Sequence, residues 1–172
     1  MSTIGKLPTE HLELDWAMFG ELCRALALKV ARDYDPEVVI GIARAGAIPA
    51  AIVASILRVD FYSMTISRRH GDEVRERPEV LSAAPRDVAG KRVLIVDEIT
   101  SSGDTLRLAL AAVRDAQPLE VRTATSFART TGYQPDYAAL ATDANVIFPW
   151  DRKIFDGNEL VVNPRYEDVL DD

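Results

Sequence analysis

Segments with the character of strands and of helices alternate along this chain, and this alternation restricts its fold more than any other feature. Four short runs rich in apolar and β-branched residues have the composition of strands: residues 38–40, 59–66, 93–96 and 119–127. Helices are predicted for three further segments: residues 15–34, 48–57 and 105–116. Because strands that alternate with helices favour a parallel sheet covered on both faces, the predicted fold class is α/β.

The remaining segments are polar or short. Residues 67–92 are charged, contain Pro78 and Pro85 and show no steady period, so a long mobile loop is expected there. Two short strands are expected at residues 137–141 and 146–148, followed by an irregular acidic end. A chain of 172 residues that is 48% hydrophobic is long enough for one sizeable core and short for two. We therefore predict a single domain over residues 1–172.

Composition and charge exclude several classes of partner. Lys and Arg number 20 against 27 Asp and Glu, and the net charge of −7 disfavours nucleic acid or an anionic membrane as the main partner. The one cysteine, Cys23, excludes an internal disulfide framework, and its helical apolar surroundings favour a buried thiol over a nucleophile. The N-terminus lacks the pattern of a signal peptide, and no apolar run has the length of a membrane span. We expect a cytoplasmic protein with a small ligand.

Two acidic residues and a loop of small residues follow the most apolar predicted strand. Asp97 and Glu98 come directly after residues 93–96, and ligands of open α/β sheets lie beyond the carboxyl ends of strands. The next residues are small, and their backbone N–H groups at a helix N-terminus are suited to a phosphate: Thr100, Ser101, Ser102, Gly103 and Thr105. The Gly-Lys-Ser/Thr ending of a P-loop is missing, and residues 41–46 lack the glycine spacing of a dinucleotide fingerprint. Nucleotide hydrolysis and hydride transfer are therefore disfavoured.

Residues 93–106 resemble the signature with which type I phosphoribosyltransferases bind 5-phosphoribosyl 1-pyrophosphate (PRPP). Over residues 14–151 the chain is most similar to the small xanthine, guanine and hypoxanthine enzymes of that family. The resemblance implies a parallel-core sheet flanked by helices, within residues 15–127, and a small hood at residues 128–155 with a contribution from the N-terminus. It also implies a Mg²⁺-dependent enzyme of purine salvage that transfers the phosphoribosyl group from PRPP to a nucleobase.

The resemblance assigns a role to each part of the motif. Asp97 and Glu98 would hold the ribose hydroxyls, with Glu98 near the Mg²⁺ ion, and residues 100–105 would wrap the 5'-phosphate. Asp97, Glu98 and Arg44 are the predicted catalytic residues. The predicted PRPP-binding residues are Arg44, Ala45, Gly46, Arg68, Asp97, Glu98, Ile99, Thr100, Ser101, Ser102, Gly103, Asp104 and Thr105. The Asp104 side chain is expected to face solvent, because its charge would repel a phosphate but suits a helix N-terminus.

Two further segments resemble the parts of these enzymes that handle pyrophosphate. Residues 41–46 resemble the pyrophosphate loop, in which Arg44 would supply positive charge and the Arg44–Ala45 peptide is expected to be cis. Residues 67–82 resemble the flexible loop that closes over the site, and Arg68 is its preferred ligand-binding residue. A lid would protect a ribosyl cation from water. His70 is expected to be a surface histidine.

The base pocket departs from the pattern of these enzymes. The residues aligned with base-binding positions are Ser101, Arg129, Asn145 and Val146. Arg129 replaces a lysine that bonds the purine 6-oxo group, Asn145 replaces the stacking ring, and Ser101 replaces an acidic residue. Rings that would substitute are Tyr133, Phe148 and Trp150, although the last two also suit a core and turn.

The acceptor therefore stays open. An oxopurine is the preferred base, while adenine, a pyrimidine or a specialised heterocycle is an alternative. A non-catalytic nucleotide or PRPP sensor on the same fold is a further alternative, because it needs no complete base pocket. A homodimer is expected from the fold class and from the helix that carries Trp16 and Phe19.

Overall fold

The computed structural model describes residues 10–70, 73–82 and 84–170, and its contacts divide the chain into two compact units. The larger unit is Leu22–Thr142, and the smaller unit combines Met1–Glu21 with Asp143–Asp172. The single domain expected for residues 1–172 stays a prediction.

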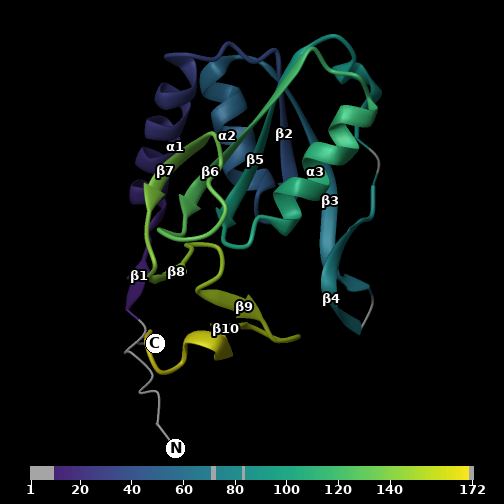
Figure 1. Ribbon diagram of the computed structural model, residues 1–172. Helices are drawn as coiled ribbons and strands as arrows, with labels where there is room; N and C mark the ends of the chain where they lie inside the picture. The colour runs from purple at the N-terminus through teal and green to yellow at the C-terminus, as the bar shows by residue number, and fades with distance from the viewer. Residues whose placement is uncertain (1–9, 71–72, 83, 171–172) are drawn as a thin grey trace, which may run out of the picture. The chain divides into compact units, whose positions relative to one another are not determined.

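The larger unit is built on a sheet of six strands in the order β4-β3-β2-β5-β6-β7 (Figure 1). Its strands are β2 (Val38–Ala43), β3 (Asp60–His70), β4 (Glu73–Val80), β5 (Arg92–Thr100), β6 (Glu120–Ala128) and β7 (Tyr137–Ala141). All neighbouring pairs are parallel except β3 with β4. The predicted α/β fold with a parallel core is confirmed.

Three helices accompany the strands: α1 (Trp16–Ala31), α2 (Ala47–Leu57) and α3 (Asp104–Asp115), with short 3-10 turns at η1 (Arg86–Val88) and η2 (Pro164–Tyr166). Asp15 caps α1 as its sequence indicates, because its Oδ1 accepts a hydrogen bond from Met18 N at 2.7 Å. The helix ends at Ala31 rather than near residue 34. Tyr34 N still donates to Val30 O at 2.9 Å, and the buried Tyr34 side chain donates its hydroxyl to Val93 O of the sheet at 2.9 Å.

Alternate residues of the central strands pack on opposite faces of the sheet. Val38 and Ile40 belong to a core cluster with residues of α3, whereas Val39 belongs to a second cluster with residues of α1 and α2. Adjacent β5 repeats the pattern, with Val93 on the first side and Leu94 on the second. Both faces are thus covered, which is why these strands are continuously apolar.

Antiparallel strands occupy residues 67–70 and 73–80, so the expectation of a long loop without regular structure is wrong for these residues, whereas its mobility stays a prediction. β3 continues to His70 and pairs with β4, with Ser67 opposite Glu79 and an irregularity between Ser67 and Arg69. Pro78 is compatible with a strand because β4 is the edge strand of the sheet. The hairpin lacks apolar alternation, and so the sequence pattern did not reveal it.

The smaller unit holds two strand pairs. β1 (His11–Glu13) pairs in parallel with β8 (Asn145–Ile147), and β9 (Lys153–Phe155) pairs in antiparallel fashion with β10 (Leu160–Val162). The second pair corrects the expectation of an irregular end. Its turn is held by Asp156 Oδ1, which accepts hydrogen bonds from the N–H groups of Asn158 and Glu159 at 2.8 and 2.9 Å.

An aromatic cluster fills part of the smaller unit. Phe148 stacks on Trp150 with ring centroids 4.6 Å apart, and Phe19 meets both rings edge-on. Phe19 is fully buried, whereas the neighbouring Trp16 is 59% exposed. Phe148 and Trp150 therefore serve packing within this unit, as the alternative interpretation of a core and turn proposed.

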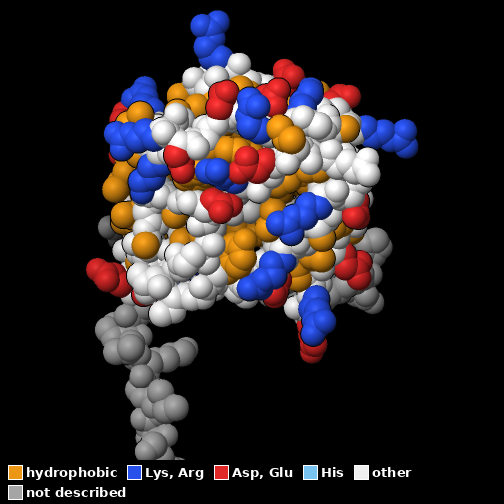
Figure 2. Space-filling model, turned by 45° about the horizontal axis from the view of Figure 1, so that its top comes forward, with side chains coloured by type: hydrophobic (Ala, Val, Ile, Leu, Met, Phe, Trp, Pro, Cys, Tyr) orange, Lys and Arg blue, Asp and Glu red, His pale blue; other side chains and the backbone are white. Residues whose placement is uncertain are grey.

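Cys23 is buried in the larger unit, and burial raises the pKa of its thiol to about 12. The thiol is therefore protonated near neutral pH and is a poor nucleophile. On the face shown in Figure 2, acidic and basic side chains are intermixed rather than gathered by sign. None of the helices within the described ranges combines the length and the apolar character that crossing a membrane requires.

Candidate active site

The order of the strands creates one place where the loops of the sheet diverge. β2 lies beside β5, yet β2 leads through α2 to β3 on one side while β5 leads through α3 to β6 on the other. Ligands of open α/β sheets bind at such a switch point, outside the carboxyl ends of the strands. The loop after β2 and the loop after β5 carry the two motifs singled out in the sequence, so the topology brings those motifs together.

Gly46, in the loop after β2, lies very close to Asp97 of β5. A Cβ atom on Gly46 would lie 2.5 Å from Asp97 Oδ1, 2.6 Å from Ile42 O and 2.9 Å from Asp97 Cα. Two of these three atoms belong to the backbone and have no rotamer with which to move away. The glycine is therefore required by the close approach of this loop to β5 and to the end of β2, not by its own φ, which is −65°.

The loop after β2 contains a non-proline cis peptide, but one bond earlier than expected. The cis bond joins Ala43 to Arg44, so the prediction of a cis bond between Arg44 and Ala45 is wrong in its position. Arg44 is exposed. With Ala45, Asp97 and Glu98 it lines a cavity of about 170 Å³ at the switch point.

A second cavity, of about 190 Å³, is enclosed by the loop after β5. Its lining includes every predicted phosphate-loop residue: Ile99, Thr100, Ser101, Ser102, Gly103, Asp104 and Thr105. Asp97 and Thr105 line both cavities, so the two lie side by side. Gly103 adopts φ of +82° immediately before α3, a conformation that favours glycine and directs the chain into the helix.

The two adjacent carboxyl groups differ in their surroundings. Asp97 is buried and Glu98 is half-buried, and Asp97 Oδ1 accepts a hydrogen bond from Glu98 N at 2.9 Å. Burial, followed by the charge of Glu98, holds the pKa of Asp97 well above its ordinary value. A buried carboxyl with a perturbed pKa in a cleft is typical of a functional site.

The donors at the switch point fit a magnesium ion that is shared with a ligand. No cluster of three or more His, Cys, Asp or Glu side chains suitable for a metal occurs in the described part of the chain. Mg²⁺ ordinarily takes one or two carboxylates and completes its shell with water and substrate phosphates. Asp97 and Glu98 match that requirement. They are too few to form a closed structural metal site, in which protein side chains supply all the ligands.

The predicted base-binding residues fall in both units. Ser101 and Arg129 lie on adjoining loops of the larger unit, where Arg129 N donates to Thr100 O at 3.2 Å. The Arg129 guanidinium donates to Thr142 O at 3.4 Å. Asn145 and Val146 belong to β8 of the smaller unit, and Val146 is buried there.

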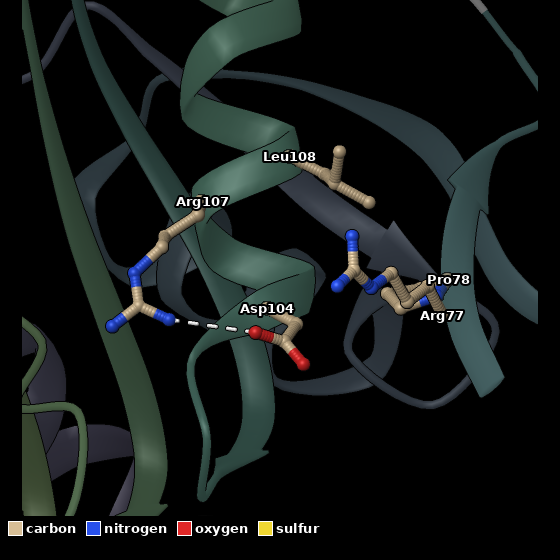
Figure 3. Close-up of a pocket in the computed structure, with 5 residues that line it drawn as sticks. All are labelled: Arg77, Pro78, Asp104, Arg107 and Leu108. Carbon is tan, nitrogen blue, oxygen red and sulfur yellow. Dashed lines mark hydrogen bonds and ion pairs between the residues drawn. The ribbon is translucent and has the colours of Figure 1, made fainter.

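The predicted lid residues are described only in part. Arg68 and His70 lie in β3, but their side chains are not among those that the structure describes. The expected roles of both residues stay predictions. Arg77 and Pro78 of β4 line a cavity of about 360 Å³ together with Asp104, Arg107 and Leu108 of α3. Figure 3 shows Arg77 and Arg107 on opposite sides of Asp104. The Asp104 side chain is 46% exposed and pairs with Arg107, so it faces solvent only in part.

Sequence reasoning did not find Arg107 beside the phosphate loop, and it named Tyr133 only as a ring that would stack on the base. A Cβ atom on Gly103 would lie 2.3 Å from the Tyr133 ring, and one on Gly132 would lie 2.6 Å from Ser101 O. The Arg107 guanidinium lies 5.0 Å from the centre of the Tyr133 ring. Tyr133 therefore packs on the phosphate loop. In the sequence, only the Gly132 that precedes it hinted at a turn.

Fold and site together define an α/β protein with a pair of carboxylates and a loop suited to an anion at the switch point of a parallel sheet. The family model of the phosphoribosyl transferase domain matches residues 14–156. The chain belongs to this family, and the predicted phosphoribosyltransferase activity is confirmed at the level of the family. The predicted resemblance over residues 14–151 agrees closely with that span.

Several solved structures share the fold. A purine phosphoribosyltransferase from Pyrococcus horikoshii Ot3 is 29% identical, with a TM-score of 0.71 over 82% of this chain and 94% of that chain. A hypothetical protein from Neisseria gonorrhoeae with bound ppGpp is 22% identical, with a TM-score of 0.73, and the match covers 85% of this chain and 92% of that chain. The xanthine-guanine-hypoxanthine phosphoribosyltransferase of Helicobacter pylori is 19% identical, with a TM-score of 0.69, and the match covers 82% of this chain and 94% of that chain. Because the last two proteins are less than 25% identical to this chain, their similarity shows a shared fold only.

Proposed function

We propose that this phosphoribosyltransferase transfers the 5-phosphoribosyl group of PRPP to a nucleobase, with an oxopurine as the preferred acceptor. A ring nitrogen of the base forms a bond to C1' while the bond from C1' to pyrophosphate breaks, and the proton of that nitrogen is released. The products are a nucleoside 5'-monophosphate and pyrophosphate. The observation that carries the proposal is the meeting of Arg44, the carboxylate pair and the phosphate loop at one switch point.

Each part of the site is suited to one part of PRPP. The loop of residues 100–105 would take the 5'-phosphate, because backbone N–H groups at a helix N-terminus favour an anion. Asp97 and Glu98 would accept hydrogen bonds from the ribose hydroxyls. Arg44 would meet the departing pyrophosphate from the neighbouring cavity. Catalysis would then be mainly positional and electrostatic.

The proposal includes a Mg²⁺ ion near Glu98 that neutralises pyrophosphate charge when bound. Removal of divalent cations with EDTA is expected to abolish pyrophosphate release, and excess Mg²⁺ is expected to restore it, because the ion would neutralise charge on the departing pyrophosphate. The measurement is an enzyme-coupled assay of pyrophosphate. Undiminished turnover in EDTA would contradict the metal requirement and leave the assignment to the family intact.

The acceptor base is the least constrained part of the proposal. The purine enzymes among the solved relatives support a purine, and Arg129 offers a forked donor for an oxo group. We expect release of pyrophosphate with guanine, hypoxanthine or xanthine to exceed that with adenine, uracil or orotate at least tenfold. An ultraviolet screen of these six bases measures this directly. A larger rate with adenine or a pyrimidine would reject the oxopurine preference.

A nucleotide sensor is the second candidate function. The neighbour from Neisseria gonorrhoeae was solved with ppGpp, and the same phosphate loop would suit the 5'-phosphate of a nucleotide here. Calorimetry with PRPP, GMP and ppGpp, beside the base screen, separates the candidates. Tight nucleotide binding with no turnover on any base would favour the sensor.

We also propose that the chain is a cytoplasmic homodimer. Trp16 and Met18 at the start of α1 are 59% and 46% exposed, and large exposed apolar side chains are typical of an interface. Light scattering of the purified protein is expected to give twice the mass of the 19.0 kDa chain. A monomeric mass at micromolar concentration would reject the dimer.

A further inference from the structure

The carbonyl groups of the phosphate loop are held from outside the site. Thr100 O accepts a hydrogen bond from Arg129 N at 3.2 Å, and Ser101 O accepts one from Tyr133 N at 3.0 Å. Ser102 O accepts the third, from the Arg107 guanidinium at 2.8 Å. Three successive carbonyl groups of the loop therefore have donors that come from the loop after β6 or from α3.

These three bonds determine where the loop directs its N–H groups. In a trans peptide the carbonyl of one residue and the N–H of the next point in opposite directions. The cis bond found in the described residues is Ala43–Arg44, outside this loop. The N–H groups of Ser101, Ser102 and Gly103 consequently point away from the three donors. Successive N–H groups that face one way form a nest for an anion.

Two side chains support this arrangement. The Arg107 guanidinium lies over the Tyr133 ring at 5.0 Å, and its Nη1 is also 3.5 Å from Asp104 Oδ1. Figure 3 shows the Arg107 side chain extended from α3 toward Asp104, away from Arg77. The Tyr133 ring in turn packs directly on Gly103. Arg107 and Tyr133 thus contact each other and adjacent parts of the loop, and we name this pair the loop brace.

We propose that Arg107 and Tyr133 are positioning residues that preorganise the phosphate loop for a 5'-phosphate. The loop brace acts through the backbone of Ser101, Ser102 and Gly103 and need not touch the ligand. This inference rests on the proposed function for the identity of the ligand. Without the brace the loop would have to be ordered by the ligand itself, and that ordering reduces affinity.

The test combines binding with loop order. Arg107→Met and Tyr133→Ala are each expected to weaken binding of ribose 5-phosphate about tenfold, measured by calorimetry, which corresponds to about 1.4 kcal/mol. The double variant is expected to lose about as much as either single variant, because the Arg107 and Tyr133 side chains support the loop only while they contact each other. Tyr133→Phe keeps the ring and is expected to rescue most of the affinity. Arg114→Met makes the same charge change at an exposed position near the end of α3 and serves as the control.

Amide relaxation in the ligand-free protein gives a readout that does not depend on the ligand. The order parameters of Ser101, Ser102 and Gly103 are expected to fall in both brace variants and to stay unchanged in Arg114→Met. Unchanged order parameters would overturn the proposal, and so would losses of affinity that multiply in the double variant, since these indicate independent ligand contacts. If the wild type does not bind ribose 5-phosphate, the proposed function fails, and the order parameters alone then decide whether the brace exists.

Discussion

Asp97→Asn is expected to lower pyrophosphate release by about 100- to 1000-fold while leaving the chain folded. The buried carboxylate lies between the two cavities, where it would orient the ribose and face the positive charge that develops on it. Glu98→Gln is expected to have a smaller effect, because Glu98 is less buried than Asp97. Initial rates of pyrophosphate release measure both effects.

Asp115→Asn is the matched control for this prediction. Asp115 is an exposed carboxylate at the end of α3, so the same chemical change there is expected to alter turnover less than twofold. Turnover above one tenth of the wild-type rate in Asp97→Asn would contradict the role given to this residue. Normal turnover in the Asp97→Asn, Glu98→Gln double variant would overturn the assignment of the site.

The same substitution is expected to stabilise the ligand-free protein above acidic pH. Burial holds the pKa of Asp97 above its unfolded value, so the folded protein binds that proton more tightly than the unfolded chain does. Wild-type stability is therefore lost as pH rises from the ordinary pKa of Asp through the raised one, and Asn, which does not ionise, avoids the loss. Thermal melts across this range are expected to favour the variant increasingly as pH rises. A constant difference between the melting temperatures would contradict this linkage.

The contiguous parts of the site were predictable because one short segment encodes them. Residues 93–106 place an apolar strand, two carboxylates and a glycine before a helix, and each of these features has a local physical reason. The alternation of strands and helices predicts that β2 and β5 are parallel, while their adjacency comes from the strand order in the structure. Local chemistry and chain order were sufficient for this half of the site.

The parts that sequence reasoning missed depend on contacts between distant segments. Arg107 and Tyr133 meet only because β6 runs beside β5 and delivers the following loop to the phosphate loop. Neither residue forms a motif by itself. The β3–β4 hairpin was missed because its long charged side chains carry no period that distinguishes a solvated strand from a loop. Whether such a charged segment forms a strand depends on its pairing with another strand in the folded protein.

Gly46→Ala is expected to reduce turnover about 100-fold, although residue 46 carries no chemical group that could react. The added Cβ would overlap Asp97 Oδ1, Ile42 O and Asp97 Cα, and so the loop after β2 must move away from β5. A displacement of about 1 Å in an active site costs rates of this order. Because the overlap also strains the backbone, a loss of about 1–3 kcal/mol in the free energy of unfolding is expected.

Gly20→Ala supplies the control that separates this close approach from the general effect of replacing glycine. Gly20 lies inside α1, and a Cβ there would meet no atom within 4 Å. In a helix interior this change is expected to raise the free energy of unfolding by about 0.5–1 kcal/mol without affecting turnover. Denaturant unfolding and initial rates of both variants give the comparison. If Gly46→Ala behaved like Gly20→Ala in both measurements, the contact between the loop after β2 and β5 would not be what positions Asp97, and the switch-point site would need another basis.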